Sequence, residues 1–147
     1  MSANQSDHYL RDAVLSASPE QLQLMLYDGA IRFSRQGMEA MDRRELDTCC
    51  EKLIRAQQIV AQIKVGLCRE ANPEFCDQVG ALCDFVYWRL VKANMDHDRK
   101  LIEDALQILE HQRDTWRMLV EKLRTEQGGP DQNTGLDEKT PRLTVQA

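Results

Sequence analysis

Residues 46–67 read LDTCCEKLIRAQQIVAQIKVGL, and their apolar side chains recur at alternating spacings of three and four. A helix brings such positions onto one side, whereas a half-buried strand would alternate apolar and polar residues with a period of two. The stretch therefore predicts an amphipathic helix whose single apolar seam packs against neighbouring helices at a shallow angle. The seam consists of Leu46, Cys49, Leu53, Ala56, Val60, Ile63 and Leu67.

A second helix is predicted upstream, beginning at Ser18-Pro19-Glu20-Gln21. Ser18 can cap the helix, proline suits its first position, and Gln21 can reach back to the backbone N–H of the cap. Apolar residues then follow one face as far as residue 41, and Tyr27 is expected in the core. Gly29 and Gly37 lie on this face and indicate close approach of another helix. Asp28 and Arg32 are spaced to form an i, i+4 ion pair.

Two further helices are predicted downstream. One begins at Asn72-Pro73 and ends at Asn94, a residue that tolerates the left-handed conformation of a helix C-cap. Asp96 or Asp98 then caps the last helix, which is apolar over a wide arc and should contact two neighbours. This helix stops at Gly128-Gly129-Pro130.

The connections between these four helices are short, which favours antiparallel neighbours. The predicted fold is all-α: an antiparallel up-down four-helix bundle over residues 18–127. Residues 128–147 are polar without periodicity and are expected to form a disordered tail. Residues 1–17 are too short for a fifth full helix and too apolar for a plain tail, so they are interpreted as an N-terminal capping segment.

Composition limits the partners. The chain has 147 residues, close to one domain, and a net charge of −5, which disfavours a nucleic acid partner. No apolar run is long enough to insert into a membrane, and the N-terminus lacks the order of a secretion signal. The five cysteines form no CxxC pair and are expected to act as small apolar residues in a reducing compartment. These features predict a cytosolic protein.

No motif points to catalysis. The sequence has no Glu-x-x-His pair for a di-metal bundle, no phosphate-binding glycine loop and no activated nucleophile, so we assign no catalytic residue, metal ligand or cofactor. His97 and Lys100 vaguely resemble the His-x-x-Lys of histidine phosphotransfer bundles, but the glycine that follows there is missing. Histidine phosphotransfer is kept as one alternative, and a self-associating helical module that swaps its N-terminal segment as another.

Two blocks of sequence together resemble the flagellin export chaperone family (FliS). The first, over residues 9–33, reads Y-x4-V-x-S-A-S-P-E-x-L-x2-M-L-Y-D-G-A-I-R-F. The second reads L-x-D-F-x-Y-x-R-L-x2-A-N-x3-D over residues 82–98 and continues with I-L-x3-R-x2-W over residues 108–116. The sequence departs from the family where Cys83 replaces a usual aromatic, where Ser16 replaces the commoner threonine, and in the tail after Gly129.

The resemblance implies a cytosolic chaperone, not an enzyme, that binds the C-terminal segment of newly made flagellin as a 1:1 complex. It would prevent premature polymerisation and deliver the subunit to a component of the flagellar type III export apparatus, without ATP or metal. A weak homodimer is left open. The N-terminal segment that carries the tyrosine is similar to a movable cap, displaced when flagellin binds.

Segments that fold on binding lay apolar anchors into grooves between a partner's helices. We therefore expect residues 7–17 to cover spare apolar surface in the free chain, as a lid or as direct contacts. Simple anchoring of the N-terminus is the alternative for Tyr9, and helix capping is the alternative for Asn94. The candidate flagellin-binding residues are Tyr9, Leu10, Val14, Ala17, Leu90 and Asn94.

Overall fold

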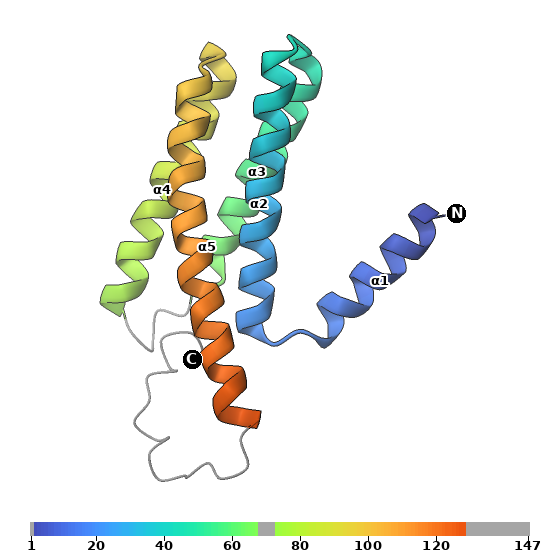
Figure 1. The fold of residues 1–147 in the computed structure, drawn as a ribbon. Helices are drawn as coiled ribbons and strands as arrows, with labels where there is room; N and C mark the ends of the chain where they lie inside the picture. The colour runs from blue at the N-terminus through green and yellow to red at the C-terminus, as the bar shows by residue number, and fades with distance from the viewer. Residues whose placement is uncertain (1, 68–72, 129–147) are drawn as a thin grey trace.

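The fold is taken from a computed structural model, which describes residues 2–67 and 73–128. All regular secondary structure in these residues is helical (Figure 1). The five helices are α1 (Ser2–Ser16), α2 (Pro19–Asp42), α3 (Leu46–Val65), α4 (Pro73–Asp96) and α5 (Arg99–Gly128).

The start of α2 confirms the predicted capping box. The backbone N–H of Gln21 donates to Ser18 Oγ at 3.1 Å, and the backbone N–H of Ser18 donates to Gln21 Oε1 at 3.0 Å. Pro19 occupies the first turn, where its missing N–H leaves no intrahelical bond unmade. The local sequence alone therefore fixes where the chain turns into α2.

The seam of α3 is buried at its five central positions, Cys49, Leu53, Ala56, Val60 and Ile63. Leu46, at the first turn, is exposed, and Leu67 follows the end of the helix and is half-buried. The prediction of one apolar seam is thus confirmed for its five central positions, and the two end positions are not buried.

Helices α2 and α3 pack closely because glycine lies at their contact. A Cβ added to Gly37 would lie 2.7 Å from Leu53 Cδ2, and one added to Gly29 would lie 3.3 Å from Ile59 Cδ1. Near the start of α2, Gln23 Nε2 donates to the carbonyl oxygen of Ile63, near the end of α3, at 3.2 Å. The two predicted packing glycines are confirmed, and the contacts run in opposite order along the two helices.

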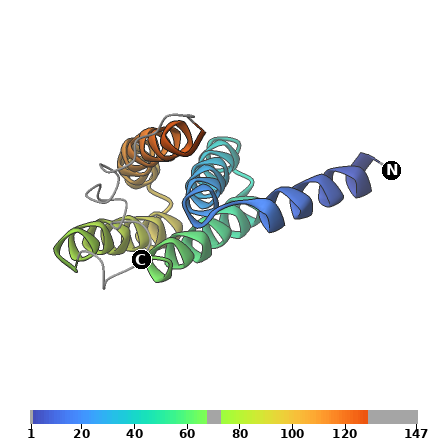
Figure 2. The ribbon, with the colours of Figure 1, turned by 90° about the horizontal axis from the view of Figure 1, so that it is seen from below.

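The other contacts complete a ring. Helix α4 packs against α3 and α5, and α5 packs against α4 and α2, so α5 contacts two neighbours as predicted (Figures 1 and 2). Tyr27 of α2 is fully buried beside Trp116 of α5, with ring centroids 6.5 Å apart, which confirms its place in the core. Asp28, however, pairs with Arg113 of α5 at 3.5 Å and not with Arg32. The predicted pair within α2 is therefore wrong, because α5 supplies another cation.

The end of α4 differs from the sequence prediction. The helix continues through Asn94 to Asp96, and His97 adopts the left-handed conformation with φ of 54°. Asn94 is not a C-cap, since its side chain donates across the helix interface to Cys50 Sγ at 3.5 Å. Asp98 caps α5 as expected, accepting from the backbone N–H of Lys100 at 3.1 Å.

The N-terminal segment also differs. Residues 2–16 form a helix, α1, which extends away from the other four and does not pack along any of them (Figures 1 and 2). The expectation that residues 7–17 cover spare apolar surface of the bundle in the free chain is wrong for this conformation, in which Tyr9, Leu10 and Val14 are exposed. Ala17 and Ser18 separate α1 from α2, and the cap at Ser18 starts α2 as an independent helix.

Several expectations fall outside the described residues. These are the cap at Asn72, the thiol of Cys68, and the tail beyond Gly128.

Candidate functional site: the groove between α3 and α4

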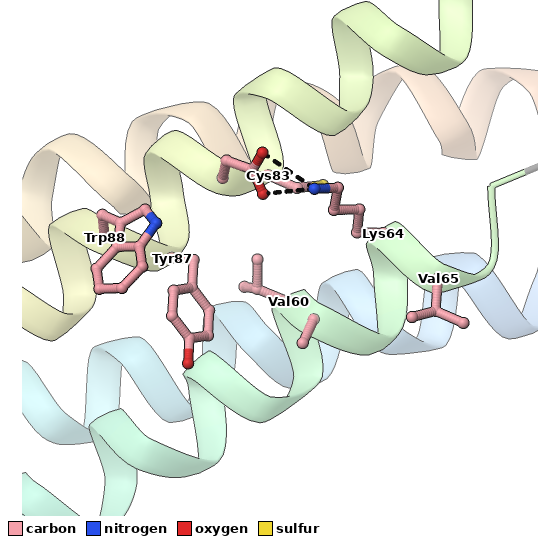
Figure 3. A pocket seen from close by; sticks show the side chains of 8 residues that line it. Val60, Lys64, Val65, Cys83, Tyr87 and Trp88 are labelled. Atoms are coloured by element: carbon pink, nitrogen blue, oxygen red, sulfur yellow. Dashed lines mark hydrogen bonds and ion pairs between the residues drawn. The ribbon is translucent and has the colours of Figure 1, made fainter. Parts of the chain in front are cut away.

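An apolar groove of about 330 Å³ lies between α3 and α4 (Figure 3). This volume is in the range of sites that bind ligands or the anchor side chains of a partner. The groove is lined by Val60, Ala61, Lys64 and Val65 of α3 and by Cys83, Asp84, Tyr87 and Trp88 of α4.

The helical register positions the groove. Val60 and Cys83 belong to the buried faces of their helices and lie deep in the groove. Tyr87 extends from α4 toward α3, whereas Trp88 lies further out along α4 (Figure 3). Ala61 and Cys83 are small side chains, so the space between the two helices is not filled.

The rim of the groove is exposed and apolar. The side chain of Val65 is 79% exposed, and that of Trp88 is 63% exposed. The Trp88 ring meets Tyr87 edge to face at 5.2 Å, a favourable aromatic geometry that fixes its orientation. Large apolar residues that gather at a hollow, rather than singly, are typical of an interaction surface.

The apolar surface continues along α4. A second hollow beside the groove is lined by Trp88, Phe85 and Ala81 together with the side chains of Arg89 and Lys92. The Arg89 guanidinium lies 4.4 Å from the centre of the Phe85 ring. Among α4 and α5, the exposed apolar surface therefore lies mainly on α4, whereas the wide apolar arc of α5 is largely buried between its two neighbours.

One ion pair spans the groove. Lys64 Nζ lies 2.9 Å and 3.0 Å from the two carboxylate oxygens of Asp84, as the dashed lines in Figure 3 show. Both side chains are about half exposed, so the pair stabilises the fold little, by less than about 1 kcal/mol. It offers a cation and an anion to the polar groups of a bound segment.

The thiol at the base of the groove is not activated. The pKa of the Cys83 thiol is raised to about 11, chiefly because burial disfavours the thiolate and further because Asp84 is close, while Lys64 opposes the shift. The thiol is thus protonated at neutral pH and is not an activated nucleophile. Among the described residues, no three His, Cys, Asp or Glu side chains gather to hold a metal ion.

The six candidate residues from the sequence do not lie together. Tyr9, Leu10 and Val14 are exposed on α1, and Ala17 is half-buried at the joint with α2. Leu90 is fully buried in the core of α4, so it cannot contact a partner in this conformation. Asn94 lies near the far end of α4, at the contact with Cys50.

The joint between α1 and α2 lines a hollow of its own. Ser16, Ala17 and Ser18 face Val120 and Leu123 near the end of α5, around a space of about 290 Å³. The structure therefore places Ala17, alone of the candidates on the N-terminal segment, against the other helices.

Sequence reasoning missed Trp88, Tyr87 and Val65. Phe85 and Trp88 broaden the apolar face of their helix in the sequence, and this is the signal that could have identified the apolar surface of α4. His97, in contrast, lies in the connection between α4 and α5 and not on a helix. The phosphotransfer interpretation, which needs an exposed helical histidine, is therefore wrong on geometry.

Comparison with solved structures first shows which fold the chain has. The chain shares its fold with a crystal structure described as a flagellar chaperone from bacteria, with a TM-score of 0.67 and 18% sequence identity. The match covers 83% of this chain and 99% of that one. None of the described helices combines the length and apolarity of a membrane span.

Sequence comparison then gives the family. Residues 1–123 match the family model for the flagellar protein FliS. The chain is 31% identical to the flagellar secretion chaperone FliS of Bacillus subtilis over 121 residues, which is 82% of this chain and 90% of that protein. It is 30% identical to the FliS of Salmonella typhimurium over 114 residues, 77% of this chain and 84% of the relative. The chain belongs to the FliS family of flagellar secretion chaperones, which is not an enzyme family.

Proposed function

We propose that this protein is a cytosolic export chaperone that binds the C-terminal segment of flagellin as a 1:1 complex. By covering that segment it prevents premature polymerisation and supports delivery to a component of the flagellar type III export apparatus. Membership of a family of flagellar secretion chaperones supports the general role. The groove between α3 and α4 supports the mode of binding.

The observation that carries this proposal is the exposed Trp88 at the rim of an unfilled apolar groove. An amphipathic segment that is disordered when free can place an apolar side chain between Val60 and Tyr87 and stack another on Trp88. Burial of a large aromatic ring at the centre of such a contact is the usual source of binding energy. Lys64 and Asp84 at the same groove favour a segment that also carries charge.

We infer that α2–α5 form an antiparallel up-and-down four-helix bundle over residues 18–127. The short connections and the opposite order of contacts along α2 and α3 and along α2 and α5 support this arrangement. Residues 1–17 act as a separate segment whose apolar residues border the bound client, and residues 128–147 are a tail.

In this proposal Tyr9, Leu10 and Val14 contact the client when α1 folds back, and Ala17 is the joint. Leu90 acts from the core by holding α4 in place. Asn94 acts by joining α4 to α3 through Cys50. Of the six candidates from the sequence, only the three on α1 are therefore direct contacts, beside the groove residues Val60, Tyr87 and Trp88.

Calorimetry of the full chain with a synthetic peptide of the flagellin C-terminus tests the proposal. We expect a stoichiometry of one and a loss of affinity of about thirtyfold in Trp88→Ala, near 2 kcal/mol. The matched control is Met118→Ala on α5, whose side chain is 69% exposed away from the groove residues, and which should bind like the parent. Equal affinities of the two variants would place the client elsewhere, and no heat with the parent would reject the function.

Self-association is the second candidate, and the exposed apolar side of α1 favours it. Tyr9 and Leu15 are each more than three-quarters exposed, so α1 can pack on a second copy. Light scattering with and without the flagellin peptide separates the two functions. A dimer that persists when the peptide is saturating supports self-association, whereas a 1:1 heterodimer supports the chaperone.

A further inference from the structure

Three cationic side chains converge on one aromatic ring at the contact of α2 and α3. The guanidinium groups of Arg32 and Arg55 lie 5.1 Å and 5.2 Å from the centre of the Phe33 ring, and Lys52 Nζ lies 5.5 Å from it. Phe33 is half-buried against the core, so the ring is held in place. We call Arg32, Phe33, Lys52 and Arg55 the Phe33 basic cluster.

The three cations have no carboxylate partner among the described residues. Asp28, four residues before Arg32, pairs with Arg113 of α5 instead. Glu51, four residues before Arg55, forms no ion pair with Arg55 or Lys52 in the described part of the chain. Several exposed cations elsewhere in the described residues are paired, as Lys64 is with Asp84 and Lys92 with Asp96.

The charge of this cluster is opposite in sign to the net charge of the chain. The whole chain has a net charge of −5, yet here three positive charges gather around one ring. Each cation is attracted to the face of the Phe33 ring by about 0.5–1 kcal/mol at an exposed site, which offsets the repulsion between the three cations. This attraction leaves the N–H donors of the two guanidinium groups unused. Free arginine forks are suited to carboxylates, which they bind through two parallel hydrogen bonds.

The cluster and the groove lie on different sides of α3. Arg55 and Lys64 are nine residues apart, about two and a half helical turns, and so face opposite directions. Lys52 and Ala61 have the same separation. The α2 side of α3 therefore carries the cluster, and the α4 side carries the groove, so that a ligand at one does not block the other.

We propose that the Phe33 basic cluster is a second binding surface, which takes an acidic segment of a partner protein. Carboxylates of the partner pair with Arg32, Arg55 and Lys52, and an apolar side chain packs on the edge of Phe33. The assignment of an acidic ligand depends only on the cluster. That the Phe33 basic cluster is occupied while a flagellin segment fills the groove rests on the function proposed above.

A titration followed by NMR tests the surface. The probe is a short helical peptide with glutamates at i, i+3 and i+4 and one leucine, and its twin carries glutamine in place of glutamate. With the full chain at low salt, we expect the acidic peptide to shift the signals of Phe33 and its neighbours and the twin to leave them unchanged. Binding should weaken as salt screens the charges.

Two variants with the same loss of charge give the decisive comparison. Arg32→Gln, Lys52→Gln and Arg55→Gln, combined, should lower the affinity for the acidic peptide by about tenfold. The control combines Arg117→Gln, Lys122→Gln and Arg124→Gln on the exposed side of α5 and should bind it like the parent. Both variants should bind the flagellin peptide as the parent does, so failure at the cluster is distinguishable from failure of the groove.

Several results would overturn this proposal. One is an acidic peptide that does not bind, and another is an equal loss of affinity in the α5 control, which would mean attraction by net charge alone. Binding of phosphatidylserine vesicles without binding of the peptide would assign the cluster to an anionic membrane. If a peptide of residues 129–147 shifted the Phe33 signals as strongly as the probe, the occupant would be the chain's own C-terminal segment.

Discussion

Helix α3 meets its two neighbours in different ways. Toward α2 the contact is tight, because Gly37 leaves no room between its backbone and Leu53. Toward α4 the helices leave a groove of about 330 Å³. A Cβ added to Gly80 of α4 would meet only the Lys64 side chain, at 3.6 Å, so glycine there does not bring the helices together.

The difference shows that an apolar seam alone does not determine how two helices pack. One buried seam of α3 supplies Leu53 to the contact with α2 and Val60 to the groove with α4. The two contacts differ in the residues that face α3: α2 presents glycine, whereas α4 presents the aromatic pair Tyr87 and Trp88. The first arrangement stabilises the fold, and the second keeps apolar surface available for a partner.

The largest expected effect is on the tight side. Leu53→Ala should lower the free energy of unfolding by about 3 kcal/mol, because a fully buried side chain leaves a cavity against Gly37. Urea unfolding followed by circular dichroism measures it. Ile54→Ala, one position along and partly exposed, is the control and should cost less than about 1 kcal/mol. Similar losses in both variants would contradict the tight packing of this side.

The next effect tests glycine directly. Gly37→Leu should destabilise the protein by about 2 kcal/mol, since the new side chain must displace Leu53 from a filled interface. Gly80→Ala should instead stabilise it by about 0.5–1 kcal/mol through helix propensity, because space is available there. The comparison fails if the two substitutions change the unfolding midpoint in the same direction.

A smaller effect is expected on α1. Tyr9→Ala should weaken binding of the flagellin peptide by about 1 kcal/mol, roughly fivefold, while the unfolding midpoint stays the same. The ring is 77% exposed in the free chain, so its removal leaves no cavity. Calorimetry and thermal unfolding measure the two quantities. A marked fall in melting temperature with unchanged affinity would instead mean that Tyr9 only anchors the N-terminus.

The smallest effect is at the groove ion pair. Lys64→Gln should change the free energy of unfolding by less than about 0.5 kcal/mol, because the side chains of Lys64 and Asp84 are both about half exposed to water. Unfolding at low and at high salt checks this, since screening should remove even that small difference. A loss of several kcal/mol would show that the pair, and not the buried seams, holds α3 to α4.

Much of the fold could be predicted because its signals are local. The seam of α3 follows from residue spacing, and the start of α2 follows from Ser18 and Gln21, whose two hydrogen bonds lie within one turn. The end of α4 could not be predicted in this way. Asn94 has the right residue type for a cap, but its side chain binds Cys50 of another helix, and His97 takes the left-handed position instead.

The candidate site was harder to predict, because it depends on which side chains face each other across two helices. Leu90 fits the apolar stripe and lies in the core, whereas Trp88 lies beside the stripe and remains exposed. The position of α1 is likewise invisible in the sequence, since its apolar residues fit either a lid or a free helix. Tertiary contacts also decide that Asp28 of α2 meets Arg113 of α5, and that Lys52 and Arg55 of α3 meet Phe33 of α2.

The most direct test of the groove uses Trp88 as its own reporter. The chain has two tryptophans, and Trp116 is buried beside Tyr27, so Trp116→Phe leaves emission from Trp88 alone. On addition of the flagellin C-terminal peptide, we predict a shift of this emission to shorter wavelength that saturates at one peptide per chain. Emission that stays unchanged while calorimetry records binding would contradict the assignment of the α3–α4 groove as the client site.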